Sequence, residues 1–172
     1  MTWVGRHITR YRDVKRTDKM NENEATIVVE HKMGASAERV FDAWIDPAMI
    51  ALWFAPELGP FERIDVDARV GGRFSIAQVR AERSTEDVSE GVVDHIGEYL
   101  VMDRPHHLRF TFGIASLEGS ESTVDVKIGP LSEGCQLTLT TSLPAEWAHY
   151  TERTREGWST LVASIDDVVS RA

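Results

Sequence analysis

Aromatic side chains are the residues of this sequence whose type and spacing best suit a binding site. Large rings supply extensive apolar contact, and they are typical of the walls of sites for apolar ligands. Strand and helix periodicity would turn six of these rings toward one interior space: Trp44, Trp53, Phe74, Phe110, Phe112 and Trp158. Two aliphatic residues, Leu161 and Ile165, lie on the same helical stripe as Trp158 and are predicted to line this space with them. Core packing alone would explain the presence of any single ring. The prediction of a ligand cavity therefore depends on all of these residues facing the same space.

Polar residues that could orient a ligand are fewer. His95 and Tyr99 share one face of a strand if no bulge intervenes, and His31 shares its face with Ile27 and Val29. A buried imidazole or phenol can bind a ligand carbonyl, or act as acid and base near neutral pH. We expect His95 and Tyr99 to border the cavity, although a satisfied core or rim side chain is the simpler interpretation of each.

Recognisable catalytic and metal-binding patterns are missing from the sequence. His106 and His107 are adjacent, so they would point to opposite faces of a strand and could not chelate one metal ion. There is no nucleophile elbow, phosphate-binding loop or dinucleotide fingerprint. We therefore expect no metal and no cofactor, assign no catalytic residue, and favour a protein that is not an enzyme.

Composition limits the partners and the compartment. The 172 residues, 42% of them hydrophobic, are enough to bury one core, and the net charge of −9 opposes attraction to nucleic acids and anionic membranes. The single cysteine, Cys135, cannot form an internal disulfide. No apolar run reaches about 18 residues and no secretory signal begins the chain. We expect a cytoplasmic protein.

Charge changes sign near Met20. Residues 1–19 carry a net charge of +4 and the remainder carries −13. We expect residues 1–19 to be a basic N-terminal extension and residues 20–172 to be a single domain. The extension is interpreted either as a poorly packed segment, with Met20 as the true start, or as a basic arm that contacts a partner or the acidic body.

Hydrophobic periodicity predicts an α+β protein. Residues 25–33 alternate as a strand, Ser36 caps a short helix, and Asp46-Pro47 ends it and begins another. No stretch between residues 61 and 141 sustains a helical period. Six further strands, joined by connections short enough for successive hairpins, are predicted at residues 61–66, 72–79, 91–102, 107–112, 123–128 and 135–141.

One long amphipathic helix is predicted after Pro144. Its apolar stripe begins at Trp147 and Tyr150 and continues through Trp158 to Val168. Such a helix would approach about 35 to 40 Å at 1.5 Å per residue, so we expect it to cross the whole concave face of a curved sheet. Gly157 is expected to let the helix backbone approach the sheet beside Trp158.

The order of these elements, together with several short motifs, resembles the START-like (SRPBCC, Bet v 1-like) helix-grip superfamily. The motifs are most similar to its branch related to the activator of the heat-shock-protein-ninety ATPase, and the similarity extends from Ala25 to Val169. They are residues 35–41, Asp46-Pro47 with Trp53, residues 67–74, residues 97–99 leading to Arg104-Pro105 and residues 108–112, and Gly157-Trp158. The resemblance implies a curved seven-stranded antiparallel sheet wrapped on the C-terminal helix, with two short helices after the first strand.

Three functions are compatible with that resemblance. The first is binding of a small hydrophobic molecule between sheet and helix without catalysis. The second is co-chaperone-like regulation of a chaperone ATPase through protein contacts, and the third is a cyclase or hydratase using an inward histidine or tyrosine. A protein partner or a homodimer stays open in each case, because one scaffold hosts all three functions. We favour the first.

Overall fold

The computed structural model describes residues 24–80 and 91–171. Seven strands and three α-helices follow one another along the chain, with two 3₁₀ turns between them. They are β1 (Ala25–Met33), α1 (Ala37–Ile45), α2 (Pro47–Trp53), η1 (Pro56–Leu58), β2 (Phe61–Val66), β3 (Arg73–Arg80), β4 (Gly91–Asp103), β5 (His107–Ile114), β6 (Ser122–Pro130), β7 (Cys135–Leu143), η2 (Ala145–Tyr150) and α3 (Thr151–Ser170). The predicted α+β class and strand count are confirmed.

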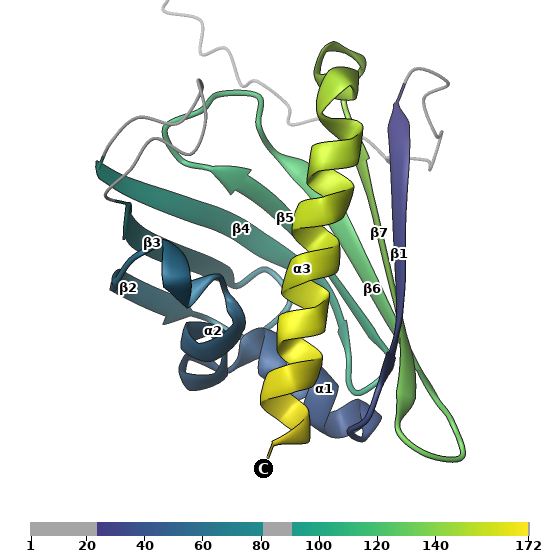
Figure 1. The fold of residues 1–172 in the computed structure, drawn as a ribbon. Helices are drawn as coiled ribbons and strands as arrows, with labels where there is room; N and C mark the ends of the chain where they lie inside the picture. The colour runs from purple at the N-terminus through teal and green to yellow at the C-terminus, as the bar shows by residue number, and fades with distance from the viewer. Residues whose placement is uncertain (1–23, 81–90, 172) are drawn as a thin grey trace, which may run out of the picture.

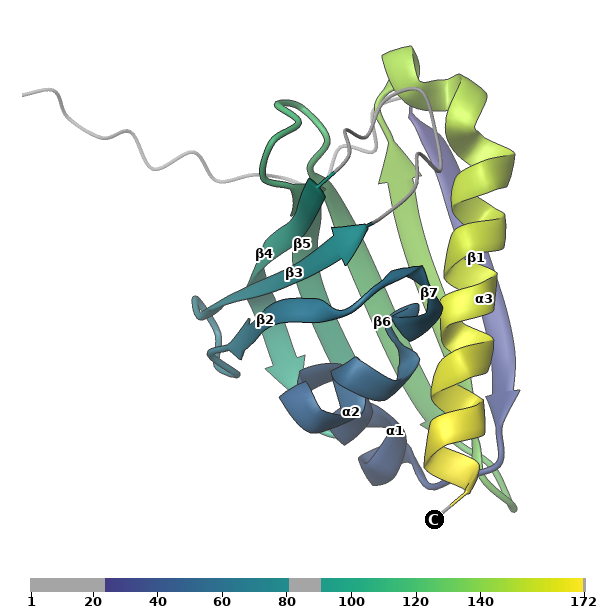
Figure 2. The same cartoon turned by 60° about the vertical axis from the view of Figure 1, so that its left-hand side comes forward.

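The strands form one antiparallel sheet in the order β1-β7-β6-β5-β4-β3-β2. Strands β2 to β7 therefore make the expected meander, and β1 pairs with β7 at one edge. The sheet curves around α3, while α1 and α2 close one end of the concave side (Figure 1; Figure 2). Most of the buried apolar side chains of the described residues form one cluster between this concave face and the helices.

Curvature depends on a close approach at Gly97 in β4. A Cβ added there would lie 1.8 Å from the Thr111 carbonyl oxygen and 2.5 Å from Cζ of Phe74. The bare glycine lets the Phe74 ring lie across β4, and the register between β4 and β5 shifts between Tyr99 and Val101. The concave face is thereby shaped at the residues that line its interior.

The two short helices begin and end as the sequence predicts. Ser36 caps α1, its Oγ accepting from the Arg39 amide at 3.4 Å. Asp46 ends α1 and caps α2, where its Oδ1 accepts from the Ala48 amide at 2.9 Å and Pro47 takes the first helical position. The paired helices turn Trp44 and Trp53 toward the sheet.

The C-terminal helix is shorter than predicted. Residues 145–150 form the 3₁₀ segment η2, so α3 contains 20 residues and spans about 30 Å. Trp147 and Tyr150 pack against each other in η2, with ring centroids 5.6 Å apart, instead of beginning the apolar stripe. The stripe buried against the sheet is Trp158, Val162, Ile165 and Val169.

Gly157 is not a point of close packing, which corrects the expectation from sequence. An added Cβ at this exposed position would have no atom within 4 Å. The neighbouring Trp158 reaches the sheet through its long side chain and therefore needs no small residue beside it. Of these two positions, Gly97 needs a glycine and Gly157 does not.

A polar latch, defined here as His31, Gly34, Asp166 and Ser170, joins β1 to the end of α3. Asp166 Oδ2 lies 3.0 Å from His31 Nε2, and its Oδ1 accepts from the Gly34 amide at 2.9 Å and from Ser170 Oγ at 3.0 Å. Burial raises the pKa of Asp166, but the hydrogen bonds from Gly34, His31 and Ser170 together lower it below its ordinary value. The latch fixes the end of α3 against the end of β1.

Exchanging the two glycines for alanine should give opposite results. Gly97→Ala should destabilise the fold by several kcal/mol, because the methyl group would overlap the Thr111 carbonyl and the Phe74 ring. Gly157→Ala should stabilise it by about 0.5–1 kcal/mol, since alanine costs less backbone entropy in a helix. Urea unfolding of both variants measures the difference, and equal effects would contradict this account of the sheet.

Replacing the carboxylate of Asp166 should make the free energy of unfolding less sensitive to pH in the acid range. Folding lowers the pKa of Asp166, so its contribution is present above the unfolded carboxyl pKa of about 3.9 and is lost as the pH falls through the lower folded value. Asp166→Asn should therefore show a smaller loss of unfolding free energy below about pH 4 than the wild type. The exposed neighbour Asp167→Asn is the control and should retain the wild-type slope.

Candidate functional site

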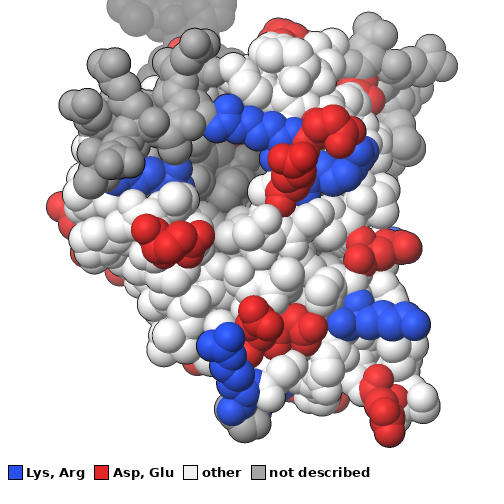
Figure 3. Space-filling view, viewed as in Figure 1, with Lys and Arg blue, Asp and Glu red and all other residues white. Residues whose placement is uncertain are grey.

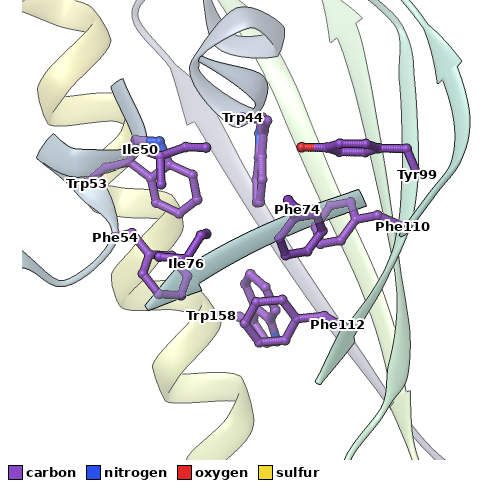
Figure 4. A pocket seen from close by; sticks show the side chains of 10 residues that line it. All are labelled: Trp44, Ile50, Trp53, Phe54, Phe74, Ile76, Tyr99, Phe110, Phe112 and Trp158. Atoms are coloured by element: carbon purple, nitrogen blue, oxygen red, sulfur yellow. The ribbon is translucent and has the colours of Figure 1, made fainter. Parts of the chain in front are cut away.

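An apolar pocket lies on the concave side of the sheet. Six elements contribute its ten lining residues: α1, α2 with its C-cap, β3, β4, β5 and α3. They are Trp44, Ile50, Trp53, Phe54, Phe74, Ile76, Tyr99, Phe110, Phe112 and Trp158 (Figure 4). Strand alternation directs Phe74 and Ile76 of β3, and Phe110 and Phe112 of β5, to this side.

The rings nearly fill the pocket by packing edge to face. Trp44 and Trp53 have centroids 5.2 Å apart, and Phe112 and Trp158 have centroids 5.1 Å apart. The remaining cavity volume is about 20 Å³. That is room for a water molecule and is too small for an organic ligand unless rings move.

His95 lies against the outer wall of this pocket. Its imidazole stacks on Phe112 with centroids 5.3 Å apart and meets the edge of Phe54 at 5.1 Å. Burial and the nearby Arg80 cation lower the pKa of His95 to about 4. At neutral pH the ring is therefore uncharged, and its Nδ1 has no hydrogen-bond partner within the part of the chain that the structure describes.

Gln78 continues the inward face of β3 beyond Ile76. Its Nε2 donates to the carbonyl oxygens of Ala55 and Gly59, each at 2.9 Å, and so ties the connection after α2 to the sheet. Its Oε1 lacks a partner in residues 24–80 and 91–171. Arg80, two positions further along the strand, has a pKa lowered by burial. This end of the concave face is consequently polar.

Figure 3 shows the same face of the molecule as a surface. Uncharged residues cover its middle, where α2 and α3 lie, and charged side chains are distributed around them. A hollow lies beside the N-terminal half of α3, with Lys and Arg side chains at its border. The aromatic pocket lies beneath the uncharged area.

The pocket brings together seven of the ten residues predicted from sequence. Trp44, Trp53, Phe74, Tyr99, Phe110, Phe112 and Trp158 line it, and His95 touches two lining rings from outside. Leu161 and Ile165 do not line the pocket, because they lie one and two turns beyond Trp158 on α3. His31 belongs to the latch with Asp166 and is not part of the pocket.

Sequence reasoning missed three lining residues. Ile76 is two positions from Phe74 on the same strand face, so alternation could have identified it. Ile50 and Phe54 lie on the apolar side of α2, as expected, but their direction depends on how α2 packs on the sheet. That packing has no signal in the local sequence.

Metal binding and membrane insertion gain no support from the described residues. In residues 24–80 and 91–171, no group of three or more histidine, cysteine, aspartate and glutamate side chains could hold a metal ion. Among the helices described, none is long and apolar enough to cross a membrane.

Comparison with solved structures places this architecture among known folds. A protein from Chromobacterium violaceum matches with 24% identity and a TM-score of 0.69, covering 86% of this chain and 99% of that one. An AHSA1-like protein from Aeromonas hydrophila matches with 24% identity and a TM-score of 0.66, covering 85% and 92%. A protein of unknown function from Staphylococcus aureus has 16% identity and a TM-score of 0.68, covering 86% and 94%. No curated protein matches the chain.

The curved antiparallel sheet, the two short helices and the crossing C-terminal helix define a helix-grip domain of the START-like superfamily. Within that class, the family model for activator of Hsp90 ATPase homolog 1-like protein matches residues 34–170. The chain belongs to this family, as the motifs in the sequence indicate.

Replacing His95 should change how stability depends on pH. The folded pKa of about 4 lies below the ordinary value of 6.5, so the unfolded chain binds a proton first as the pH falls. Wild-type stability should therefore fall by about 3 kcal/mol between pH 6.5 and 4 from this group alone. His95→Phe, which keeps a ring against Phe54 and Phe112, should lack this loss.

Urea unfolding at intervals from pH 4 to 7 checks this prediction. The exposed His149→Asn variant is the control and should behave as the wild type does. A His95→Phe curve parallel to that of the wild type would show that the imidazole is not held neutral.

Proposed function

We propose that the protein binds a small, largely apolar molecule in the aromatic pocket between the curved sheet and α3. The observation that supports this proposal is the pocket wall itself, ten side chains from six elements that are almost wholly apolar yet leave a residual cavity of about 20 Å³. Rings from so many elements offer a flat apolar ligand extensive contact. The bound molecule would be a cytoplasmic one, in keeping with the free, buried Cys135.

Binding requires rings to move, and the surroundings of the pocket allow it. Phe112 is only half-buried, and Trp158 is held by ring contacts with Phe112 and Trp44 instead of by an aligned helix-to-helix interface. Rotation of either ring would enlarge the cavity at the cost of some packing energy. A flat apolar ligand would replace the lost contacts by stacking on the same rings.

The geometry gives less support to the other two functions, catalysis and regulation of a chaperone ATPase. His95 and Tyr99 lie on the same face of β4, but burial lowers the pKa of His95 to about 4 and raises that of Tyr99. Neither group is poised to exchange protons near neutral pH, as an acid–base catalyst should be. Regulation of a chaperone ATPase is implied by the family's description alone.

Ligand binding should raise the melting temperature in a way that depends on Trp158. A compound that binds only the folded state, present at a concentration of about 100 times its dissociation constant, adds roughly 2.7 kcal/mol to the free energy of unfolding. For a protein of this size, that raises the melting temperature by several degrees. We expect such a shift with one- or two-ring apolar compounds, and a co-purified mass in native mass spectrometry. Trp158→Leu should lower the affinity of the protein for the compound by about tenfold or more.

The matched control is Trp147→Leu, which removes an indole from η2 outside the pocket and should leave the affinity unchanged. If no mass co-purifies and no compound shifts the melt of the wild type, the proposal fails. An equal loss of affinity in both variants would place the site elsewhere.

A further inference from the structure

Trp44 presents an unsatisfied hydrogen-bond donor at the pocket. Its side chain is 5% exposed, and its Nε1 has no partner within the described part of the chain. Its neighbour Trp53 differs, because Trp53 Nε1 donates to the Ala43 carbonyl at 2.8 Å. An indole N–H can only donate, and leaving such a group unpaired in an apolar interior costs about 1–3 kcal/mol. Trp44 therefore lacks an acceptor.

Tyr99 supplies a second donor from the opposite wall. Its side chain is 3% exposed, and Figure 4 shows its hydroxyl directed toward Trp44. Both rings contact Phe110, with centroid distances of 5.9 Å for Trp44 and 6.4 Å for Tyr99. Burial raises the pKa of Tyr99, so the phenol stays protonated and able to donate at neutral pH.

We propose that the ligand carries a ketone-type carbonyl on its apolar ring, and that Trp44 Nε1 and the Tyr99 hydroxyl bind this oxygen together. The inference rests on the proposed function and specifies the chemistry of its ligand. A carbonyl oxygen has two lone pairs, one for each donor, whereas an ammonium group could accept from neither and would find an acceptor only in the phenol oxygen. A hydrocarbon of the same shape would leave the buried Trp44 donor unpaired.

A ligand carbonyl would pair a donor that the unliganded protein leaves unpaired. The cavity of about 20 Å³ is lined by both Trp44 and Tyr99, but Trp44 Nε1 is buried without a partner in the described residues, so the ring movements that admit a ligand must also expose this group. A carbonyl oxygen placed there would accept from Trp44 Nε1, whereas an apolar group would leave that donor unpaired. The pocket should therefore discriminate between two ligands that differ only at this atom.

Acetophenone and α-methylstyrene are the probes, because they differ only in having C=O or C=CH₂ beside the same ring. In isothermal titration calorimetry we expect the wild type to bind acetophenone about tenfold more tightly. Tyr99→Phe should remove most of that preference, measured as the ratio of the affinities for the two probes. Tyr150→Phe, a tyrosine of η2 outside the pocket, should behave as the wild type does.

Trp44→Phe gives a second, independent test of the pair. It removes the other donor and should likewise lower the ratio of the acetophenone affinity to the α-methylstyrene affinity, while circular dichroism and a cooperative thermal melt show that this variant is folded. The carbonyl stretching band of bound acetophenone should also lie at lower frequency in the wild type than in Tyr99→Phe, since hydrogen bonding weakens the C=O bond. This spectroscopic difference would not arise from a purely structural role of the ring.

Two outcomes separate this inference from the proposed function. If both probes bind the wild type equally and neither variant alters the ratio, the carbonyl site is wrong and the apolar pocket stands. If neither probe binds, the proposed function is overturned for single-ring ligands and the carbonyl site with it. Preference for acetophenone that survives in both variants would also overturn the assignment to Trp44 and Tyr99.

Discussion

The contact between Trp158 of α3 and Phe112 of β5 is the interaction on which the interior depends. A curved sheet and one straight helix enclose more space at the open side of the curve than strand side chains can fill. Large rings from the helices and from β3, β4 and β5 fill that space, and the 5.1 Å contact between Trp158 and Phe112 joins the helix to the sheet.

The concave face is divided by the chemistry of its side chains. From the middle of the sheet to β1, aliphatic residues such as Val126 and Leu139 belong to the same buried cluster as Val162 and Ile165 of α3. Toward β3 and β4 the face carries rings, and Gln78 Oε1 and His95 Nδ1 have no hydrogen-bond partner within the described residues. Aliphatic packing is therefore concentrated at one end, and rings with unsatisfied polar atoms at the other.

Family membership and structural similarity bear on different parts of this description. The family match and the shared fold account for the sheet, the paired helices and the crossing helix. They do not extend to the pocket side chains, since a likeness at 24% identity or below shows the fold alone. The hydrogen-bond donors of Trp44 and Tyr99 are side chains of this chain itself, and the inference of a ligand carbonyl rests on them.

The sequence by itself determined the elements, because alternation, capping residues and glycine turns act locally. Ser36, Asp46 and the alternating strand residues fixed helix starts and strand faces, so most pocket rings could be predicted. The start of α3 could not, since the apolar period continues through Trp147 while the chain after Pro144 forms a 3₁₀ turn. Only the tertiary structure decided that Ile50 and Phe54 reach the pocket, that Gly97 makes a close contact, and that Trp44 Nε1 has no partner among the described residues. These depend on how separate elements pack, which no local pattern specifies.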